Sequence, residues 1–319
     1  MTIRKLKWMM LVGIAGVAVT LNTSAWDGTG HMLVAQIARD RMSSQAVTRV
    51  DAVAAQLTYY GVPYNGVTIS CWPDDIKTND TSVPFQGQFK PLHYIDIGCA
   101  ATDPDVFAHA TTLTKTKGDV ITALNHCVDV IKNKKTDELV PSEAVALALV
   151  VHFVADIHQP LHTTARYNPD PKPDDKYKHD AGGNGVTVTN LVDTPWWKNL
   201  HTFWDEAYRR YYENGEVKAL PELKQATALG GTEMKEWTRK LSSATPAKQP
   251  ALQFDPKKWA LEVHEVACAQ VYGTLGEPYG AKNIKLQEKY VNDSAQLARR
   301  QLVLAGYRLA ALLNELYGK

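Results

Sequence analysis

The stretch EAVALALVVHFVADIHQPLH, Glu143–His162, decides the fold. Residues 144–151 are apolar on every side of a helix, so we predict that this helix is central and buried. His152 and Asp156 are four residues apart, which places them on one face of the helix, where both can bind one metal ion. A proline then ends the helix, and His162 returns from the following turn. A lone pair of this kind also caps or bridges helices, so the rest of the chain decides whether it is a metal site.

Helical periodicity dominates the rest of the chain. Apolar residues recur with helical spacing in the segments 32–41, 47–59, 120–132, 143–157 and 259–272, and in a C-terminal leucine series, Leu297, Leu304, Leu309, Leu312, Leu313 and Leu316. The segment Gly185–Val192 alternates and predicts a short strand or β-hairpin. We find no internal repeat and no dividing linker. The sequence therefore predicts a mostly α fold, with residues 26–319 forming a single helical domain that carries a short β-hairpin.

Residues 1–25 have the pattern of a secretory signal peptide. Basic residues precede an apolar run, Met9–Leu21, and the small residues Thr23–Ala25 form a cleavage site. Cleavage after Ala25 would make Trp26 the first residue of the mature chain. An uncleaved anchor is the alternative, but the apolar run is too short to span a bilayer comfortably. We expect a periplasmic or secreted protein without stable membrane association.

The charges of the chain nearly cancel. Lys and Arg number 35 against 34 for Asp and Glu, which gives a formal net charge of +1. This balance excludes a protein that grips polyanions with a broad basic surface. If the substrate is a nucleic acid, a local pocket must recognise it.

The chain has four cysteines, Cys71, Cys99, Cys127 and Cys268, and an oxidising compartment makes disulfides plausible. We favour a bond between Cys71 and Cys99, because both flank segments that contain metal-ligating residue types. The alternative is that the cysteines are free and buried as small apolar residues. No C-x-x-C pair exists, so we do not expect cysteine to bind zinc.

Three further groups of histidine and aspartate strengthen the metal interpretation of the buried helix. They are His201 with Asp205, which repeats the four-residue spacing; Asp74 with His93; and His31, five residues after Trp26.

Together these motifs resemble the S1/P1 nuclease family, which comprises zinc-dependent single-strand nucleases and 3'-nucleotidases related to bacterial zinc phospholipase C. The resemblance begins at the tryptophan amino terminus and continues through W-x-D, L-H-Y-I-D, H-x-x-x-D-x-H-Q-P-L-H, G-G-N and N-L-H-x-x-W-D, in that order. It covers the whole mature chain. The family is mostly helical, in agreement with the periodicity.

The resemblance implies three zinc ions with nitrogen and oxygen ligands. The first would bind Asp74, His93, His152 and Asp156; the second the α-amino nitrogen and carbonyl oxygen of Trp26, His31 and the bridging Asp156; and the third His162, His201 and Asp205. An α-amine binds metal only after cleavage frees it, so export and site assembly would be linked. Alternatively, Trp26 is simply an aromatic residue packed near a new terminus.

The resemblance also implies the reaction, which is cleavage of single-stranded RNA, single-stranded DNA and 3'-nucleotides at the 3' side, releasing 5'-phosphates. Bound zinc would screen the phosphate charge and activate water. Asp74 would orient or deprotonate that water, and Lys77, one turn further if this segment is helical, would neutralise charge that develops on the phosphate. The alternative for Lys77 is a solvated surface lysine.

For base binding, the resemblance points to Tyr94 as a stacking residue, with Asp96 and Asn184. Asn184 follows two glycines that would let a flat base approach the backbone closely, although they could equally form a turn. Stacking favours unpaired strands and tolerates sequence.

The other histidines are less informative. His158 projects from a different helical face than His152 and Asp156, so we interpret it as a structural histidine or one that supports a ligand. The remaining four, His109, His126, His179 and His264, lack partners at ligand spacing.

Two rival functions remain. A zinc phospholipase C would bind its metal ions with a similar arrangement of ligands. Its third site is expected to end in glutamate, whereas this chain has Asp205. A non-catalytic zinc-binding protein would have closed coordination, and the bridging Asp156 argues for an open site.

Overall fold

The computed structural model describes residues 26–77, 80–99, 113–114, 117–170, 179–192, 198–219 and 252–319. The predicted signal peptide, residues 1–25, lies outside them. The helices are α1 (Gly28–Arg39), α2 (Ser44–Ala54), α3 (Trp72–Asp75), α4 (Val120–Asn133), α5 (Glu143–Asp156), α6 (Leu200–Asp205), α8 (Pro256–Val266), α9 (Gly273–Leu275) and α10 (Glu288–Tyr317), with a π-helix η6 (Ala267–Tyr272) between α8 and α9. Short 3-10 helices are η1 (Thr68–Cys71), η2 (Lys90–Leu92), η4 (Pro160–His162) and η5 (Ala207–Arg209). The mostly α prediction is confirmed.

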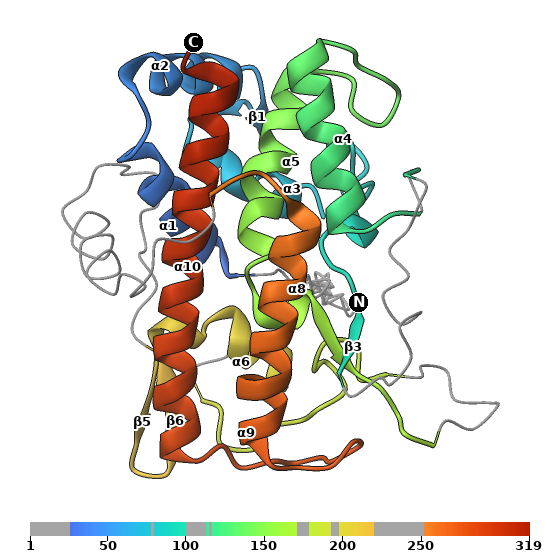
Figure 1. Ribbon diagram of the computed structural model, residues 1–319, viewed down its shortest axis with the longest axis vertical. Helices are drawn as coiled ribbons and strands as arrows, with labels where there is room; N and C mark the ends of the chain where they lie inside the picture. The colour runs from blue at the N-terminus through green and yellow to red at the C-terminus, as the bar shows by residue number, and fades with distance from the viewer. Residues whose placement is uncertain are drawn as a thin grey trace, which may run out of the picture.

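Helix α5 is the buried centre of the fold, as its sequence predicts. Every residue from Ala144 to Asp156 is buried, and the Ser142 side chain caps the helix by accepting a hydrogen bond from the Val145 N–H. In Figure 1, α5 lies between α10 and α4, and α10 runs nearly the full length of the molecule. Apolar burial on all sides fixes the helix, so its polar C-terminal residues are held rigidly inside the protein.

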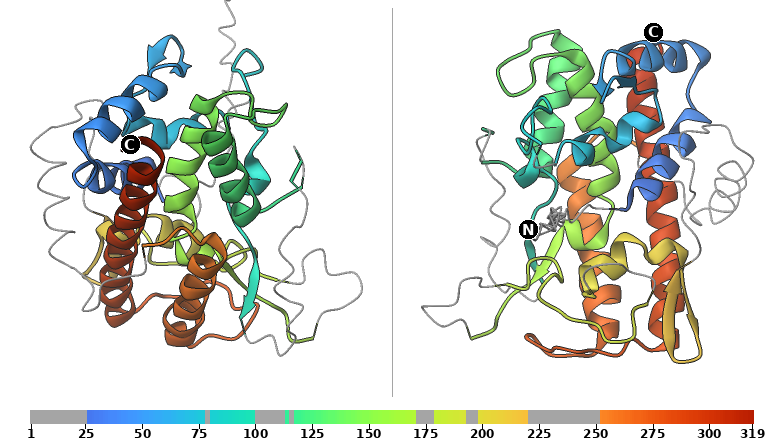
Figure 2. Two further views of the ribbon diagram at one scale, coloured as in Figure 1. Left: turned by 45° about the horizontal axis from the view of Figure 1, so that its top comes forward. Right: turned by 180° about the vertical axis from the view of Figure 1, so that it is seen from behind.

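Helix α1 packs closely against α10. A side chain at Gly306 of α10 would overlap Ile37 of α1, so the glycine permits this close approach. Helix α5 contacts α1 and α3, and α6 contacts η4, the turn that follows α5; these segments can be followed in the view from behind (Figure 2). Segments far apart in the sequence therefore meet where α5 ends.

The strands form three separate pairs. They are β1 (Thr58–Tyr59) with β2 (Val62–Pro63), β3 (Ile97–Cys99) with β4 (Thr164–Arg166), and β5 (Arg210–Glu213) with β6 (Glu216–Ala219). The β3–β4 pair is parallel, with Ile97 opposite Thr164, and the other two pairs are antiparallel hairpins.

The strand or hairpin predicted at Gly185–Val192 is wrong. This stretch makes only isolated bridges, in which Thr187 pairs with Asn199, Val188 with Ile284 and Leu191 with Val217. Val186, Val188 and Leu191 are buried, but the stretch pairs with three different segments rather than with itself. Alternation reports burial of one face and does not identify the pairing partner.

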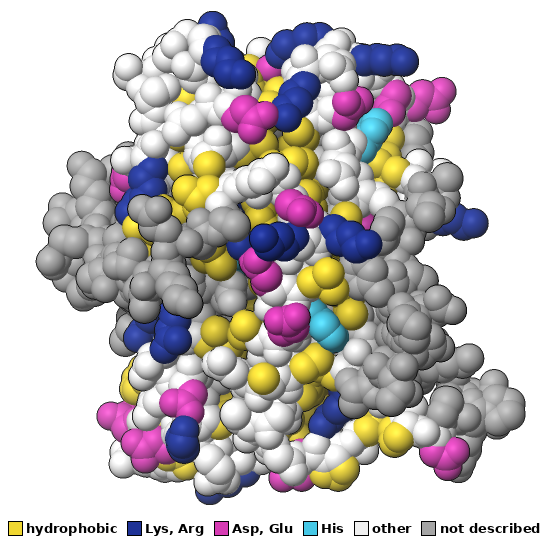
Figure 3. Space-filling model, viewed as in Figure 1, with side chains coloured by type: hydrophobic (Ala, Val, Ile, Leu, Met, Phe, Trp, Pro, Cys, Tyr) yellow, Lys and Arg dark blue, Asp and Glu magenta, His cyan; other side chains and the backbone are white. Residues whose placement is uncertain are grey.

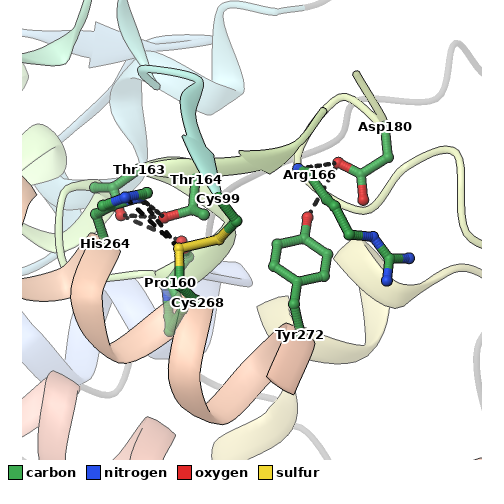
Figure 4. Close-up of a disulfide and its surroundings, with 9 residues drawn as sticks. All are labelled: Cys99, Pro160, Thr163, Thr164, Arg166, Asp180, His264, Cys268 and Tyr272. Carbon is green, nitrogen blue, oxygen red and sulfur yellow. Dashed lines mark hydrogen bonds between the residues drawn. A yellow bond between two sulfur atoms is a disulfide. The ribbon is translucent and has the colours of Figure 1, made fainter. Parts of the chain in front are cut away.

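The predicted Cys71–Cys99 disulfide is also wrong. Cys99, at the end of β3, bonds to Cys268 in η6, with 5.5 Å between their Cα atoms (Figure 4). Pairing with β4 places β3 beside η6, whereas the free Cys71 lies at the end of η1 with its Sγ atom 3.5 Å from the Gly28 carbonyl oxygen. Cys127 is free and buried.

Among the described residues, no helix combines the length and the apolar character needed to cross a membrane.

Candidate metal centre

The first cluster of ligand-type residues forms at the C-terminal end of α5. His152 Nε2 lies 3.3 Å from Asp156 Oδ2, as the four-residue spacing predicts. His93, which follows η2, places its Nδ1 atom 2.9 Å from Asp156 Oδ2 and 3.0 Å from His152 Nε2. The Oδ1 atom of Asp74 on α3 completes the group at 3.7 Å from His152 Nε2 and 4.0 Å from His93 Nδ1. Four side chains from three segments thus converge on one buried point.

A backbone contact fixes the orientation of the His152 ring. Its Nδ1 atom lies 2.6 Å from the Ser70 carbonyl oxygen, which requires the proton on that nitrogen. The lone pair is therefore on Nε2, which faces His93 and the two carboxylates. A backbone carbonyl that fixes the tautomer in this way is typical of metal-ligating histidine.

The second cluster joins His31 to the same aspartate. His31 Nε2 lies 3.4 Å from Asp156 Oδ1, and its ring stacks on His152 with centroids 3.8 Å apart. Asp156 therefore turns one carboxylate oxygen toward His31 and the other toward His93 and His152. Two oxygens that face different ligand groups are what a bridging carboxylate requires.

Trp26 is fully buried and lies close to predicted ligands. Its indole Nε1–H donates to the carbonyl oxygen of Ala155 at 3.0 Å, and the next residue, Asp27, donates its backbone N–H to the carbonyl oxygen of Asp205 at 3.1 Å. Trp26 is thus hydrogen-bonded to the residue that precedes Asp156, and Asp27 is hydrogen-bonded to Asp205. Its role as a terminal-amine ligand stays a prediction.

The third cluster consists of His162, His201 and Asp205, whose ligand atoms lie within 4.8 Å of one another. The Nδ1 atom of His162 contacts the His93 carbonyl oxygen at 2.9 Å, and that of His201 contacts the Gly182 carbonyl oxygen at 2.7 Å. Both contacts leave Nε2 as the lone-pair nitrogen.

Gln159 supports this third cluster and was not singled out from the sequence. Its Nε2 donates to Asp205 Oδ1 at 2.7 Å, while its Oε1 accepts from the backbone N–H of Leu161. Its position between the predicted ligands Asp156 and His162 was the available signal.

Burial leaves the histidines neutral and the carboxylates poorly solvated. Burial lowers the pKa of His31 to about 3 and the pKa values of His93, His152 and His201 to about 4. It also raises the pKa of the Asp156 carboxyl, and that of Asp205 well above its usual range. Both nitrogens of His31, and Oδ1 of Asp156, are buried without a hydrogen-bond partner. Neutral imidazoles and uncompensated buried carboxylates fit a divalent cation.

Lys77 belongs to the first cluster. Its Nζ lies 2.6 Å from Asp74 Oδ1 and 3.4 Å from His93 Nδ1, and its side chain is only 7% exposed. The alternative of a solvated surface lysine is therefore wrong. Burial raises the pKa of Asp74, but Lys77 and the neighbouring histidines outweigh it, so that the pKa lies well below its usual range.

The predicted base-binding residues have different surroundings. Tyr94 is 43% exposed beside His93, and Asp96 lies 4.0 Å from His179. Asn184 donates its side-chain amide to the carbonyl oxygen of Ala181 at 2.9 Å, within a glycine turn. The two glycines pack against Leu161 and His201, so packing alone accounts for them. Base binding by these residues stays a prediction.

The other histidines have structural contacts where they are described. His158 Nδ1 contacts the Val154 carbonyl oxygen at 2.7 Å and its Nε2 accepts from Arg308 at 2.9 Å, which is the structural role predicted. His126 pairs with Asp137 at 3.0 Å, and His264 lies against Thr164 and the disulfide (Figure 4). His109 lies outside the described residues.

Comparisons with known proteins agree with this geometry. The family model for S1/P1 nuclease matches residues 26–318. Nuclease S1 of Aspergillus oryzae is 26% identical over 96% of this chain and 96% of its own length. Endonuclease 4 of Arabidopsis thaliana is 26% identical over 92% of this chain and 89% of its own, and nuclease P1 of Penicillium citrinum 23% over 92% and 98%. The chain therefore belongs to the S1/P1 nuclease family.

Proposed function

We propose that the mature chain is a zinc-dependent phosphoesterase that cleaves single-stranded RNA, single-stranded DNA and 3'-nucleotides and releases 5'-phosphates. Family membership supports a hydrolase that acts on nucleic acid esters. The observation that carries the finer proposal is Asp156, whose two oxygens face two different groups of histidines inside the protein.

The proposed ligands form three sets, of which the first two share this aspartate. Asp74, His93, His152 and Asp156 would hold the first zinc ion; His31, Asp156 and the amino nitrogen and carbonyl oxygen of Trp26 the second; and His162, His201 and Asp205 the third. Histidine nitrogen and carboxylate oxygen are ligands that suit zinc. When bound, the ions would screen the negative charge of the phosphate and provide an activated water.

Asp74 and Lys77 are the proposed catalytic residues. The Asp74 carboxylate would orient the attacking water and accept its proton. Lys77 Nζ, at 2.6 Å from Asp74 Oδ1, would place a positive charge beside the phosphate, where charge develops in the transition state. Because Lys77 is buried, little water screens this charge.

Substrate recognition would depend on a few residues near the metal centre rather than on the charge of the whole surface. Positive and negative side chains are interspersed on the face shown in Figure 3, and the net charge is +1. The exposed Tyr94 ring would stack on an unpaired base, with Asp96 and Asn184 contacting its edge. Stacking needs an accessible base face, so this mode would favour single strands over duplexes.

Export would be a condition for assembling the site. Cleavage after Ala25 would free the Trp26 amine for metal binding, in the periplasm or outside the cell. The Cys99–Cys268 disulfide supports an oxidising compartment.

The test is hydrolysis by purified mature protein of single-stranded RNA, single-stranded DNA and 3'-AMP, with phosphatidylcholine vesicles as a fourth substrate. We expect activity on the three nucleotide substrates, loss with a chelator and recovery with zinc. Activity on the vesicles alone would show a phospholipase, and zinc-loaded protein inactive on all four would show a zinc-binding protein. Either result would overturn the proposal.

A further inference from the structure

We propose that Asp27 is a positioning residue that ties His31 to Asp205, so that the second and third metal clusters are held as one unit. The inference rests on the proposed zinc sites. It concerns a residue that lies outside the three proposed ligand sets.

The backbone of Asp27 is bonded to both ligand residues. Its carbonyl oxygen accepts from the N–H of His31 at 3.1 Å, and its own N–H donates to the carbonyl oxygen of Asp205 at 3.1 Å. His31 and Asp205 are far apart in the sequence and lie on different helices, α1 and α6. One peptide segment therefore sets the distance between two ligands of different clusters.

The side chain of Asp27 fixes that segment from two directions. Its Oδ1 atom caps α1 by accepting from the Gly30 N–H at 2.8 Å and also accepts from the Tyr208 hydroxyl at 2.8 Å. Its Oδ2 atom accepts from Arg209 Nε at 3.1 Å. The carboxylate thus contacts the first turn of the helix that carries His31 and the η5 segment, which begins two residues after Asp205.

The surroundings make this carboxylate hard to replace. Its side chain is 15% exposed and that of Arg209 6%, and Arg209 also contacts Glu206 at 2.9 Å. Little water is available to take over these hydrogen bonds, so removing the carboxylate leaves buried donors unsatisfied. The rings of Trp26 and Tyr208 are in edge-to-face contact, with centroids 6.2 Å apart. The group of contacts around the Asp27 carboxylate therefore extends to the predicted first residue.

A purely structural cap would behave differently from a positioning residue. Asp255 offers a control, because its exposed side chain caps α8 by accepting from the Lys258 N–H at 3.0 Å and it belongs to none of the three clusters. Loss of either cap would lower thermal stability. Only loss of the side-chain contacts of Asp27 would also change zinc affinity.

The experiment measures zinc per chain and zinc affinity by chelator competition for wild-type mature protein, Asp27→Ala, Asp27→Asn, Tyr208→Phe and Asp255→Ala. We expect Asp27→Ala to weaken two of three zinc ions about tenfold or more, the range seen for groups that orient metal ligands. Asp27→Asn keeps an oxygen for the cap but places an amide against Arg209, so its loss should be smaller. Tyr208→Phe should lose affinity with its fold intact.

Two results would overturn the inference. One is Asp27→Ala with the zinc content and affinity of wild type and a stability loss like that of Asp255→Ala. The second result applies if Asp27→Ala does not fold: it is a zinc affinity that is unchanged in both Asp27→Asn and Tyr208→Phe. In either case wild-type zinc binding would leave the proposed function standing, whereas a wild-type protein that binds no zinc would remove both.

Discussion

The Nδ1 atom of His93 lies 3.0 Å from the Nε2 atom of His152, although the two residues are 59 positions apart. Both rings are buried, and burial lowers the pKa of each to about 4. Asp156 Oδ2 lies 2.9 Å and 3.3 Å from the same two nitrogens. One proton can serve only one of these contacts at a time, whereas a cation at their centre would satisfy all of them.

The shared aspartate provides the first prediction. Asp156→Asn replaces one of two anionic oxygens by an amide that cannot ligate, so at least one zinc ion should be lost. Activity should fall about a hundredfold or more. Zinc analysis and single-strand hydrolysis measure both effects, with Asp293→Asn, an exposed partner of Lys289, as the control. Full zinc content and full activity in Asp156→Asn would exclude bridging.

Lys77 provides a prediction that separates chemistry from assembly. Lys77→Met removes a buried positive charge but no metal ligand, so kcat should fall about a hundredfold or more while zinc content is unchanged. Lys77→Arg should recover part of the loss. The control is Lys218→Met, which removes a lysine that pairs with Glu213 on the β5–β6 hairpin. If Lys77→Met kept the wild-type kcat, the catalytic role would be wrong.

Two glycines with similar backbone conformation test the support of the third cluster. Gly182 has φ of 58° and Gly280 has φ of 80°, so alanine at either position costs about 1 kcal/mol of conformational energy. A side chain at Gly182 would overlap the Leu161 carbonyl oxygen, whereas Gly280 has open space. Gly182→Ala should therefore lower the free energy of unfolding by roughly 1–3 kcal/mol more than Gly280→Ala. It should also weaken the zinc ion at His201, whose Nδ1 contacts the Gly182 carbonyl. Equal effects in urea unfolding and zinc titration would refute this.

The disulfide is predicted to stabilise the fold strongly because its cysteines are 169 residues apart. The double variant Cys99→Ala with Cys268→Ala should lose about 2–5 kcal/mol of unfolding free energy in denaturant titrations. Peptide mapping without reduction should recover a Cys99–Cys268 peptide, with thiol reagent labelling Cys71 and Cys127 in the denatured chain. A linked Cys71–Cys99 peptide would contradict the structure.

The helices could be predicted from the sequence because apolar periodicity directly reports a buried face. The segments 120–132 and 143–157 correspond to α4 (Val120–Asn133) and α5 (Glu143–Asp156) within two residues at each end. Helical spacing also placed His152 beside Asp156. The grouping of the remaining ligands came from the family motifs.

Long-range contacts could not be read in the same way. The partner of Cys99 depends on the parallel pairing of β3 with β4, which brings in a helix more than a hundred residues further along the chain. The alternation at Gly185–Val192 likewise gave the buried face but not its three separate partners. The contacts of Asp27 with Arg209 and of Gln159 with Asp205 join residues that are distant in the sequence, and they exist only in the folded chain.

The central claim is that this protein holds three zinc ions on the predicted ligands. The most direct measurement is anomalous diffraction at the zinc absorption edge from crystals of the mature protein beginning at Trp26. We predict three peaks, one among Asp74, His93, His152 and Asp156, one between His31, Asp156 and the Trp26 amino nitrogen, and one among His162, His201 and Asp205. Zinc-soaked crystals with no peak beside Asp156, or with one peak that leaves His31 without a metal, would contradict the account.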